Sequence, residues 1–154
     1  MKTATRPIED ISAIDTLCDA FINRKAVIGI IGLGYVGLPL ACAICDKGFK
    51  AVGFDVDADK ISRLERGQSY IGNIHNDTVS GFVRDKNFVP TADFSKLADV
   101  DAIILCVPTP LNKNREPDMT YVEKTARTVA QHLKPGHLVV LESTTWPGTT
   151  TALV

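Results

Sequence analysis

Three glycines stand close together in the segment GLGYVG, which spans residues 32–37. Gly32, Gly34 and Gly37 follow the apolar run AVIGII of residues 26–31 and precede a segment with the pattern of a helix. In such a turn the first glycine allows the sharp change of direction, the second leaves the backbone open to a ligand, and the third lets helix and strand approach each other. The start of the helix adds N–H groups and a positive dipole end, so the pattern is typical of a site for phosphate groups.

A carboxylate follows this turn at the place where dinucleotide binding requires one. Asp55 comes directly after a second apolar segment, KAVGF, at residues 50–54. At the end of a strand it would accept hydrogen bonds from the adenosine ribose hydroxyls and repel a 2′-phosphate, which favours NAD over NADP. The alternative is that Asp55 is only a turn residue or a helix cap, which Asp57 could be instead. The full order of strand, glycines, helix, strand and acid predicts dinucleotide binding.

Two further apolar segments end in residues that could contact a ligand. VPTP at residues 107–110 and ESTTWPG at residues 142–148 each come at the end of a predicted strand. Ligands of open parallel sheets bind at the carboxyl ends of the strands, so Thr109 and the hydroxyls around Thr144 could hold a ribose, a nicotinamide amide or a water. Threonine, serine and proline also make plain loops, and composition alone leaves both interpretations open.

The elements that must position these residues alternate between strands and helices. This order predicts an α/β fold, a Rossmann-like doubly wound and mostly parallel sheet, with an extra N-terminal helix. Strands are predicted at residues 26–31, 50–54, 88–91, 101–107 and 138–142. Helices are predicted at residues 8–23, 35–47, 57–66, 75–84 and 118–136, the second stopped by Gly48 and the last by Gly136, with a single turn at 95–98. We expect residues 1–25 to be a helical extension and residues 26–154 to be the dinucleotide-binding domain.

Composition excludes several classes of partner. The chain has 154 residues, 45% of them hydrophobic, and a net charge of −1, so no strong field would attract nucleic acid or an anionic membrane. No apolar run is long enough to span a bilayer and no signal peptide is evident, so we expect a cytoplasmic protein. Cys42 and Cys45 form a C-x-x-C in the middle of a predicted helix, without a second pair of ligands. We interpret them as core residues, and expect no metal site and no disulfide framework.

Three motifs together resemble a known family. GLGYVGLPLA at residues 32–41, CVPTPLN at 106–112 and ESTTWPGTT at 142–150 are similar, in this order, to the UDP-glucose/GDP-mannose dehydrogenase family. The resemblance covers residues 27–154 and looks closest to the branch that oxidises UDP-N-acetyl-hexosamines, such as UDP-N-acetylglucosamine 6-dehydrogenases. It implies NAD-dependent oxidation of the C6 alcohol of a UDP-sugar to a carboxylate, in two hydride transfers through a thioester on a cysteine. This chemistry serves polysaccharide biosynthesis.

The resemblance also implies roles for individual residues. Thr144 would help to hold a catalytic water or the sugar oxygen, and Thr109 would contact the cofactor. The expected cofactor contacts lie in the glycine turn, in the segment that begins at Asp55, and at the last two strand ends. They are Gly32, Gly34, Tyr35, Val36, Gly37, Asp55, Lys60, Val107, Pro108, Thr109 and Thr144.

The family's nucleophilic cysteine, its lysine and its aspartate lie in later domains. None of the four cysteines here stands in a matching motif. We therefore expect the chain to bind NAD but not to catalyse alone, with most of the UDP-sugar site and the contacts of a homodimer or larger oligomer in domains that it lacks.

Two alternatives remain open. The first is the N-terminal domain of a β-hydroxyacid dehydrogenase, which has a similar glycine turn but usually different residues at the later strand ends. The second is a dinucleotide-sensing module without catalysis. Such a module would keep residues 32–55 but would not need a hydroxyl at Thr144, and it would need a basic or apolar face for its partner. Lysine and arginine are scattered along the chain, which argues against a basic face.

Overall fold

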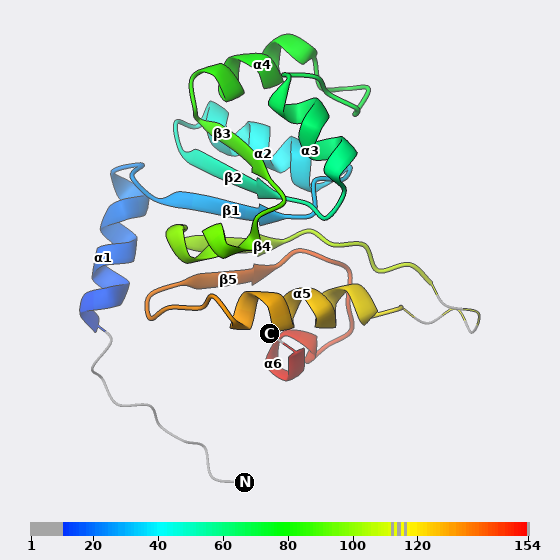
Figure 1. The fold of residues 1–154 in the computed structure, drawn as a ribbon. Coiled ribbons are helices and arrows are strands. Elements are labelled where there is room, and N and C mark those ends of the chain that lie inside the picture. Colours follow the sequence, from blue (N-terminus) through cyan, green and yellow to red (C-terminus); the bar gives the residue numbers. More distant parts are fainter. Residues whose placement is uncertain (1–10, 112, 114, 116, 154) are drawn as a thin grey trace, which may run out of the picture.

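Five parallel strands form a single sheet in the order β3-β2-β1-β4-β5 (Figure 1). The structure is a computed structural model that describes residues 11–153 except 112, 114 and 116. The strands are β1 (Val27–Ile31), β2 (Lys50–Phe54), β3 (Phe88–Thr91), β4 (Ala102–Leu105) and β5 (Leu138–Leu141). This order, with the first strand central and later strands added on both sides, is that of a Rossmann-like fold, so the predicted fold class is confirmed.

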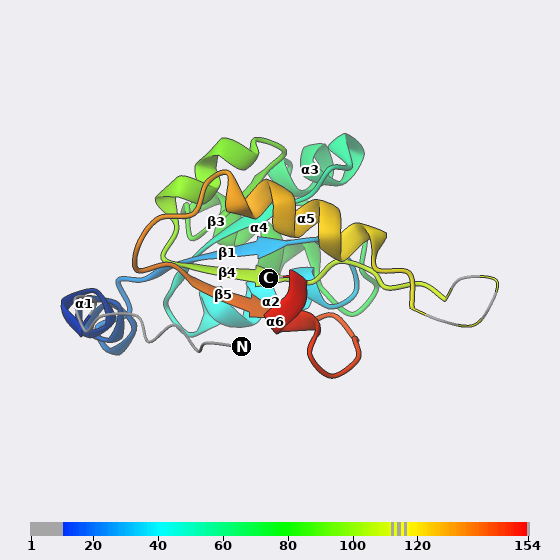
Figure 2. The same cartoon turned by 90° about the horizontal axis from the view of Figure 1, so that it is seen from below.

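Helices cover both faces of the sheet. The helices are α1 (Ile11–Ile22), α2 (Gly37–Asp46), α3 (Ala58–Glu65), α4 (Asn76–Arg84), α5 (Thr120–Ala130) and α6 (Thr149–Leu153), with a 3₁₀ helix at Phe94–Asp99. One core cluster joins α2, α3 and α4 to one face of the sheet, and a second joins the 3₁₀ helix and α5 to the other. Figure 2 shows α2 and α5 on opposite sides of β1 and β4.

The side chains of β1 explain this two-sided burial. Ile28 and Ile30 belong to the first cluster, whereas Ile31 belongs to the second. Successive side chains of a strand point to opposite faces, so a strand covered on both sides must be apolar throughout, as the run AVIGII is. The central strand is therefore rigidly held, and the glycine turn that follows it starts from a fixed position.

Most element boundaries lie within one or two residues of the sequence predictions, and α2, for example, begins at Gly37 where residue 35 was predicted. β2 and β3 have the predicted bounds, and Gly48 follows α2 with a φ of 84° as expected for a helix stop. β4 was predicted to end at residue 107 but ends at Leu105. Its partners β1 and β5 end opposite Leu105, at Ile31 and Leu141. α5 ends at Ala130, so the prediction that Gly136 stops it was wrong. Gly136, with a φ of 89°, lies in the turn before β5 instead.

The N-terminal helix α1 lies beside the end of the sheet where the strands begin (Figure 1). Its contact with the rest of the protein includes the ring of Phe21, whose centroid is 6.0 Å from that of Phe49. Ile14 and Ile22 on the same helix are largely exposed. The predicted start of this helix, at residue 8, lies outside the described residues. No helix in the described part of the chain has both the length and the apolar character that crossing a membrane requires.

Candidate cofactor site

The three glycines of the turn are required for different reasons. Gly32 has a φ of 92°, and a Cβ there would come within 2.8 Å of the carbonyl oxygen of Cys106. A Cβ on Gly37 would overlap the carbonyl oxygen of Gly32. By contrast, a Cβ on Gly34 would meet no atom within 4 Å. The fold itself therefore demands glycine at positions 32 and 37, while the bare backbone at Gly34 leaves open space that a ligand can use.

Asp55 connects the end of β2 to this turn. Its carboxylate is buried, with 6% of the side chain exposed. Oδ2 accepts hydrogen bonds from the backbone N–H of Leu33 at 2.9 Å and from Lys60 Nζ at 3.2 Å, and Oδ1 accepts one from the N–H of Asp57 at 3.0 Å. Asp55 thus supports the glycine turn while Lys60 balances its charge.

The cap of α3 is a different carboxylate. Asp57 Oδ1 accepts from the N–H groups of Asp59 at 3.0 Å and Lys60 at 3.3 Å, which are donors that the start of a helix leaves without partners. The sequence left open whether Asp55 is itself the cap. The structure assigns the cap to Asp57, so capping does not account for the carboxylate of Asp55.

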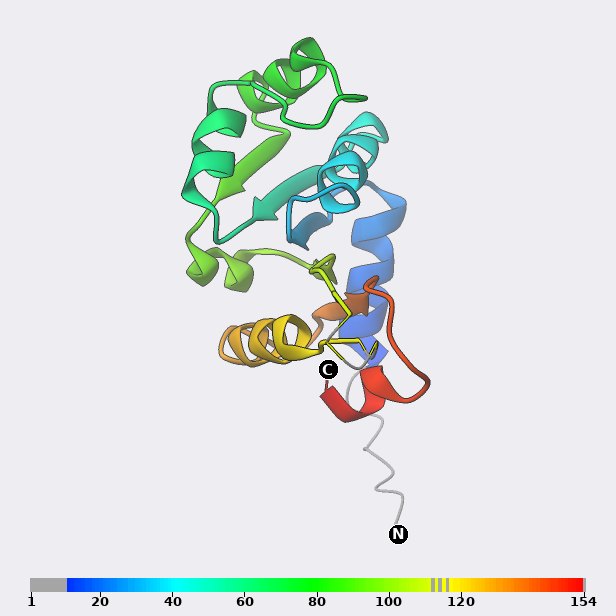
Figure 3. The ribbon, with the colours of Figure 1, turned by 90° about the vertical axis from the view of Figure 1, so that its right-hand side faces the viewer.

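A pocket of about 690 Å³ opens where the strands end. Figure 3 views the molecule from this side, with the loops that follow β1, β4 and β5 toward the viewer. Every expected cofactor contact except Gly37 lines the pocket: Gly32, Gly34, Tyr35, Val36, Asp55, Lys60, Val107, Pro108, Thr109 and Thr144. Residues from four separate segments of the sequence therefore meet at one hollow, and Gly37 serves the packing of α2 against the turn.

Sequence reasoning missed another group of lining residues. Tyr121, Lys124 and Thr125 come from the first turns of α5. Val56 comes from the loop after β2, and Phe94 is the first residue of the 3₁₀ helix. The three residues of α5 are spaced three and four apart, which places them on one helix face. That spacing was the available signal, but only the packing of α5 on the sheet reveals that this face borders the pocket.

The last two strand ends are tied to each other. Ser143 Oγ donates to the carbonyl of Val107 at 2.6 Å, and the N–H of Glu142 donates to the carbonyl of Leu105 at 3.0 Å. These bonds hold the segments that carry Thr109 and Thr144 side by side at the mouth of the pocket. The two strand ends that the sequence assigned to the ligand side therefore lie next to each other.

Cys42, Cys45 and Cys106 pack on the core and have protonated thiols, whereas Cys18 is exposed. Burial, and secondarily the nearby Glu142, raises the pKa of the Cys106 thiol to about 11. Burial is also the largest cause that raises the pKa of Cys42, and that of Cys45 to about 12. Cys45 Sγ donates to the carbonyl of Asn87 at 3.2 Å. These thiols lack the lowered pKa of a reactive cysteine. Within the described residues, no cluster of His, Cys, Asp or Glu could hold a metal ion.

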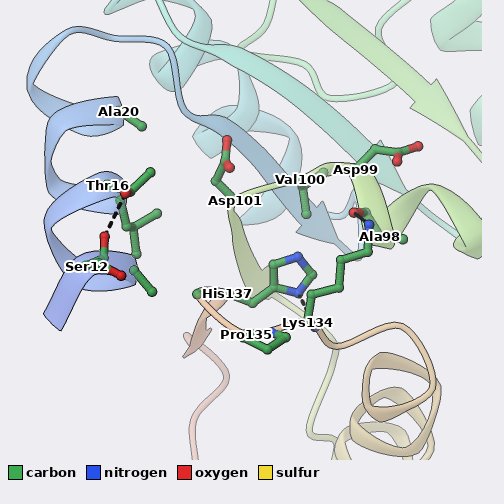
Figure 4. Close-up of a pocket in the computed structure, with 13 residues that line it drawn as sticks. Ser12, Thr16, Ala20, Ala98, Asp99, Val100, Asp101, Lys134, Pro135 and His137 are labelled. Carbon is green, nitrogen blue, oxygen red and sulfur yellow. Dashed lines mark hydrogen bonds between the residues drawn. The ribbon is translucent and has the colours of Figure 1, made fainter. Parts of the chain in front are cut away.

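A second pocket, of about 380 Å³, lies at the opposite edge of the sheet, between α1 and the turn before β5 (Figure 4). Its polar side chains make hydrogen bonds to nearby backbone. Lys134 Nζ donates to the carbonyl of Ala98 at 2.6 Å, and Asp101 Oδ2 accepts from the N–H of Val27 at 2.7 Å. His137 Nδ1 accepts from the N–H of Lys134 at 3.2 Å. These bonds stabilise the start of the sheet.

Comparison with known proteins identifies the chain's family. Residues 26–154 match the family described as UDP-glucose/GDP-mannose dehydrogenase family, NAD binding domain. The chain belongs to this family. It is 38% identical over 125 residues to UDP-N-acetyl-D-mannosamine dehydrogenase of Escherichia coli K12, a match that covers 81% of this chain and 29% of that protein. It is 39% identical over 124 residues to UDP-N-acetyl-D-glucosamine 6-dehydrogenase of Salmonella typhi, covering 80% and 28%.

Solved structures of nucleotide-sugar dehydrogenases have the same fold. GDP-mannose dehydrogenase from Pseudomonas aeruginosa superposes with a TM-score of 0.78 at 32% identity, over 82% of this chain and 30% of that one. NDP-N-acetyl-D-galactosaminuronic acid dehydrogenase from Methanosarcina mazei superposes with a TM-score of 0.75 at 34% identity, over 89% and 32%. This chain thus spans about three tenths of the length of the relatives that it matches.

The family match confirms that this is the NAD-binding domain of a nucleotide-sugar dehydrogenase, and that its cofactor is NAD. It favours the first of the three interpretations drawn from the sequence over a β-hydroxyacid dehydrogenase domain or a sensing module. The glycine turn and Asp55 now have a ligand whose chemistry suits them, because NAD carries both a pyrophosphate and a free adenosine 2′-hydroxyl.

Proposed function

We propose that the pocket at the carboxyl ends of the strands holds NAD for an enzyme that oxidises the C6 alcohol of a UDP-N-acetyl-hexosamine to the uronic acid. The relatives named above that act on UDP-N-acetyl-D-mannosamine and UDP-N-acetyl-D-glucosamine support this substrate class. The observation that carries the cofactor assignment is the open space at Gly34, beside a buried carboxylate and at the start of α2. When bound, NAD supplies the acceptor for the hydride that leaves the sugar.

The residues present suit successive parts of the cofactor. The backbone from Gly32 to Val36 would hold the pyrophosphate, because it combines bare glycine backbone with the positive end of a helix. Asp55 would accept a ribose hydroxyl, with Lys60 beside it as a donor to the same sugar. A 2′-phosphate on that ribose would instead meet the negative charge of the Asp55 carboxylate. This arrangement supports a preference for NAD over NADP.

The nicotinamide end would lie toward the segments that carry Thr109 and Thr144. Thr144 is exposed at the mouth of the pocket, next to the Ser143–Val107 bond that fixes the end of β5. We assign it the catalytic task of holding a water or the sugar oxygen by its hydroxyl. A threonine can both donate and accept, which that task requires.

We further propose that this chain alone binds NAD without turning over substrate. The raised pKa values of Cys42, Cys45 and Cys106 make them poor candidates for a nucleophile, and the chain spans only about three tenths of its relatives. The sugar-binding part and the subunit contacts of a homodimer would then lie in the remaining length of such an enzyme. The family match begins at residue 26, which supports an added segment at residues 1–25.

Calorimetric titration of the 154-residue chain with NAD, NADP and UDP-N-acetylglucosamine tests these proposals together. We expect heat of binding from NAD, much weaker binding of NADP, and none from the sugar nucleotide. Binding of the sugar nucleotide in the absence of NAD would contradict the division of the two sites. Equal affinities for NAD and NADP would contradict the role of Asp55.

A further inference from the structure

Tyr70 reaches the glycine turn from a distant part of the chain. It stands in the segment between α3 and α4, and its hydroxyl donates to the backbone carbonyl of Leu33 at 2.5 Å. The two residues are 37 positions apart in the sequence. Tyr70 is not one of the residues that line the cofactor pocket. Its hydroxyl therefore contacts the turn without being part of the pocket lining.

This bond completes a clamp around Leu33. The N–H of Leu33 donates to Asp55, and its carbonyl accepts from Tyr70, so both of its backbone polar groups have side-chain partners. The Leu33 side chain is fully buried, and a Cβ added at Gly53 would come within 2.8 Å of its Cδ2. The residue between the first two glycines is thus fixed at its backbone and at its side chain.

The carbonyl that Tyr70 holds belongs to the same peptide unit as the N–H of Gly34. A trans peptide is planar, with its C=O and N–H directed to opposite sides, so holding the carbonyl also sets the direction of the N–H. Glycine has the greatest freedom to rotate its flanking peptides, and nothing within 4 Å of the Cβ position restrains Gly34 on the ligand side. The orientation of this N–H therefore depends on a partner for the carbonyl.

Tyr70 is itself held in place and kept protonated. The Arg63 guanidinium lies over its ring, 5.5 Å from the centroid, and Arg63 also donates to the carbonyl of Ser69 at 2.9 Å. The N–H of Ser69 donates to Asn76 Oδ1 at 2.8 Å, which fixes the segment to the start of α4. Burial, and then the negative charge of Asp55, raises the pKa of Tyr70, so the phenol remains a donor across the physiological range.

We propose that Tyr70 is a positioning residue of the NAD site, which directs the N–H of Gly34 toward the pyrophosphate by holding the carbonyl of Leu33. The proposal rests on the assignment of this pocket to NAD. It extends that site to a segment, between α3 and α4, that contributes no residue to the lining of the pocket. Binding of any nucleotide with a pyrophosphate should therefore depend on Tyr70. Binding of adenosine alone should not.

The variant Tyr70→Phe tests this, because it keeps the ring against Arg63 and removes only the hydroxyl. Binding of NAD, ADP-ribose and adenosine to the 154-residue chain would be measured by ligand-observed NMR and calorimetry. We expect Kd to rise about fivefold for NAD and ADP-ribose, the effect of one lost hydrogen bond, and to stay unchanged for adenosine. The matched control is Ser69→Ala, which removes both hydrogen bonds between Ser69 Oγ and the backbone of Ile71 in the same segment but leaves the Leu33 carbonyl bonded. It should bind all three ligands like the wild type.

The outcomes distinguish a failure of the positioning role of Tyr70 from a failure of the assignment of the pocket to NAD. If the wild-type chain fails to bind NAD, the assignment of the pocket is wrong. If the wild type binds NAD and Tyr70→Phe loses affinity equally for NAD, ADP-ribose and adenosine, Tyr70 supports only the general fold and the positioning role is refuted. Unchanged affinity for all three ligands would refute it as well. A loss confined to the two pyrophosphate ligands would establish it.

Discussion

The two pockets at opposite edges of the sheet contain similar kinds of side chains but present them differently. The pocket where the strands end receives the start of α2 and the bare backbone of Gly34. The pocket where the strands begin contains Lys134, whose ammonium bonds to a carbonyl, and His137. Burial, and then Lys134, lowers the pKa of His137, so its ring is neutral near pH 7. Because α2 and α5 begin at the edge where the strands end, their first N–H groups lie on the side of the cofactor pocket. Chain direction thus distinguishes the edges better than composition does.

The largest expected effect is that of Gly34→Val. Gly34 is not among the glycines with positive φ and has no neighbour within 4 Å, so the fold should accept valine while the side chain fills the space of the pyrophosphate. We expect NAD affinity to fall on the order of 100-fold, with a nearly unchanged melting temperature. Calorimetry and thermal unfolding measure the two quantities.

Gly37→Ala is the matched contrast within the same turn. Its new Cβ would overlap the carbonyl of Gly32, so this variant should lose stability, by roughly 1–3 kcal/mol of unfolding free energy. If Gly34→Val unfolded the protein instead, glycine at position 34 would be required by the fold, and the contrast with Gly37 would be wrong.

Asp55→Ala should have the next largest effect. It removes the hydrogen bonds of a charged acceptor, so we expect NAD to bind about 1–3 kcal/mol more weakly. Loss of the negative charge should also improve the binding of NADP relative to NAD, as competitive titration would measure. The control is Asp57→Ala, which removes the cap of α3 and should lower stability by about 1 kcal/mol without changing the NAD-to-NADP ratio. An unchanged ratio in Asp55→Ala would mean that another residue reads the ribose.

Thr144→Ala should have a small effect on cofactor binding. The residue is exposed, and its proposed partner is a water or the sugar, so NAD affinity should change by less than about 0.5 kcal/mol. In a full-length enzyme of this family that carries the same segment, the equivalent change should lower kcat. A large loss of NAD affinity in the isolated chain would instead make Thr144 a cofactor ligand only.

The smallest expected effect is that of Lys134→Ala at the opposite edge. It removes the hydrogen bond to the carbonyl of Ala98, so a slight loss of stability is expected, with NAD affinity unchanged. This variant tests the comparison directly, because Lys60→Ala removes the same kind of charge from the cofactor pocket. Lys60→Ala should weaken NAD binding. If the two lysine variants changed NAD affinity equally, the proposed difference between the two pockets would be wrong.

Local patterns predicted the elements whose boundaries are set locally. β2 begins and ends where its apolar run does, and Asp57 caps α3 with its own side chain, as its position suggested. The end of β4 was missed because it is set by the lengths of the neighbouring strands, and those lie elsewhere in the sequence. Gly136 was misassigned because a positive φ suits both a helix stop and a turn before a strand.

The same division applies to the candidate site. Glycines and an acid at fixed spacing are a local signal, so Gly34 and Asp55 could be predicted from the sequence alone. Tyr121 and Tyr70 come to the site through the packing of α5 and through the segment between α3 and α4. The spacing of Tyr121, Lys124 and Thr125 indicates only a shared helix face, and the residues around Tyr70 give no sign of a bond to the glycine turn. Such residues become visible only when the path of the chain in space is known.

The double attachment of Asp55 limits how the coenzyme preference of this domain could be redesigned. The same carboxylate that would read the ribose also holds the N–H of Leu33, so a small apolar replacement chosen to admit a 2′-phosphate would loosen the turn that must grip the pyrophosphate. A successful exchange would need to keep an acceptor at position 55 and place the new positive charge elsewhere. Val56, which is 86% exposed on the rim of the same pocket, is the position where an arginine could be added without disturbing the turn.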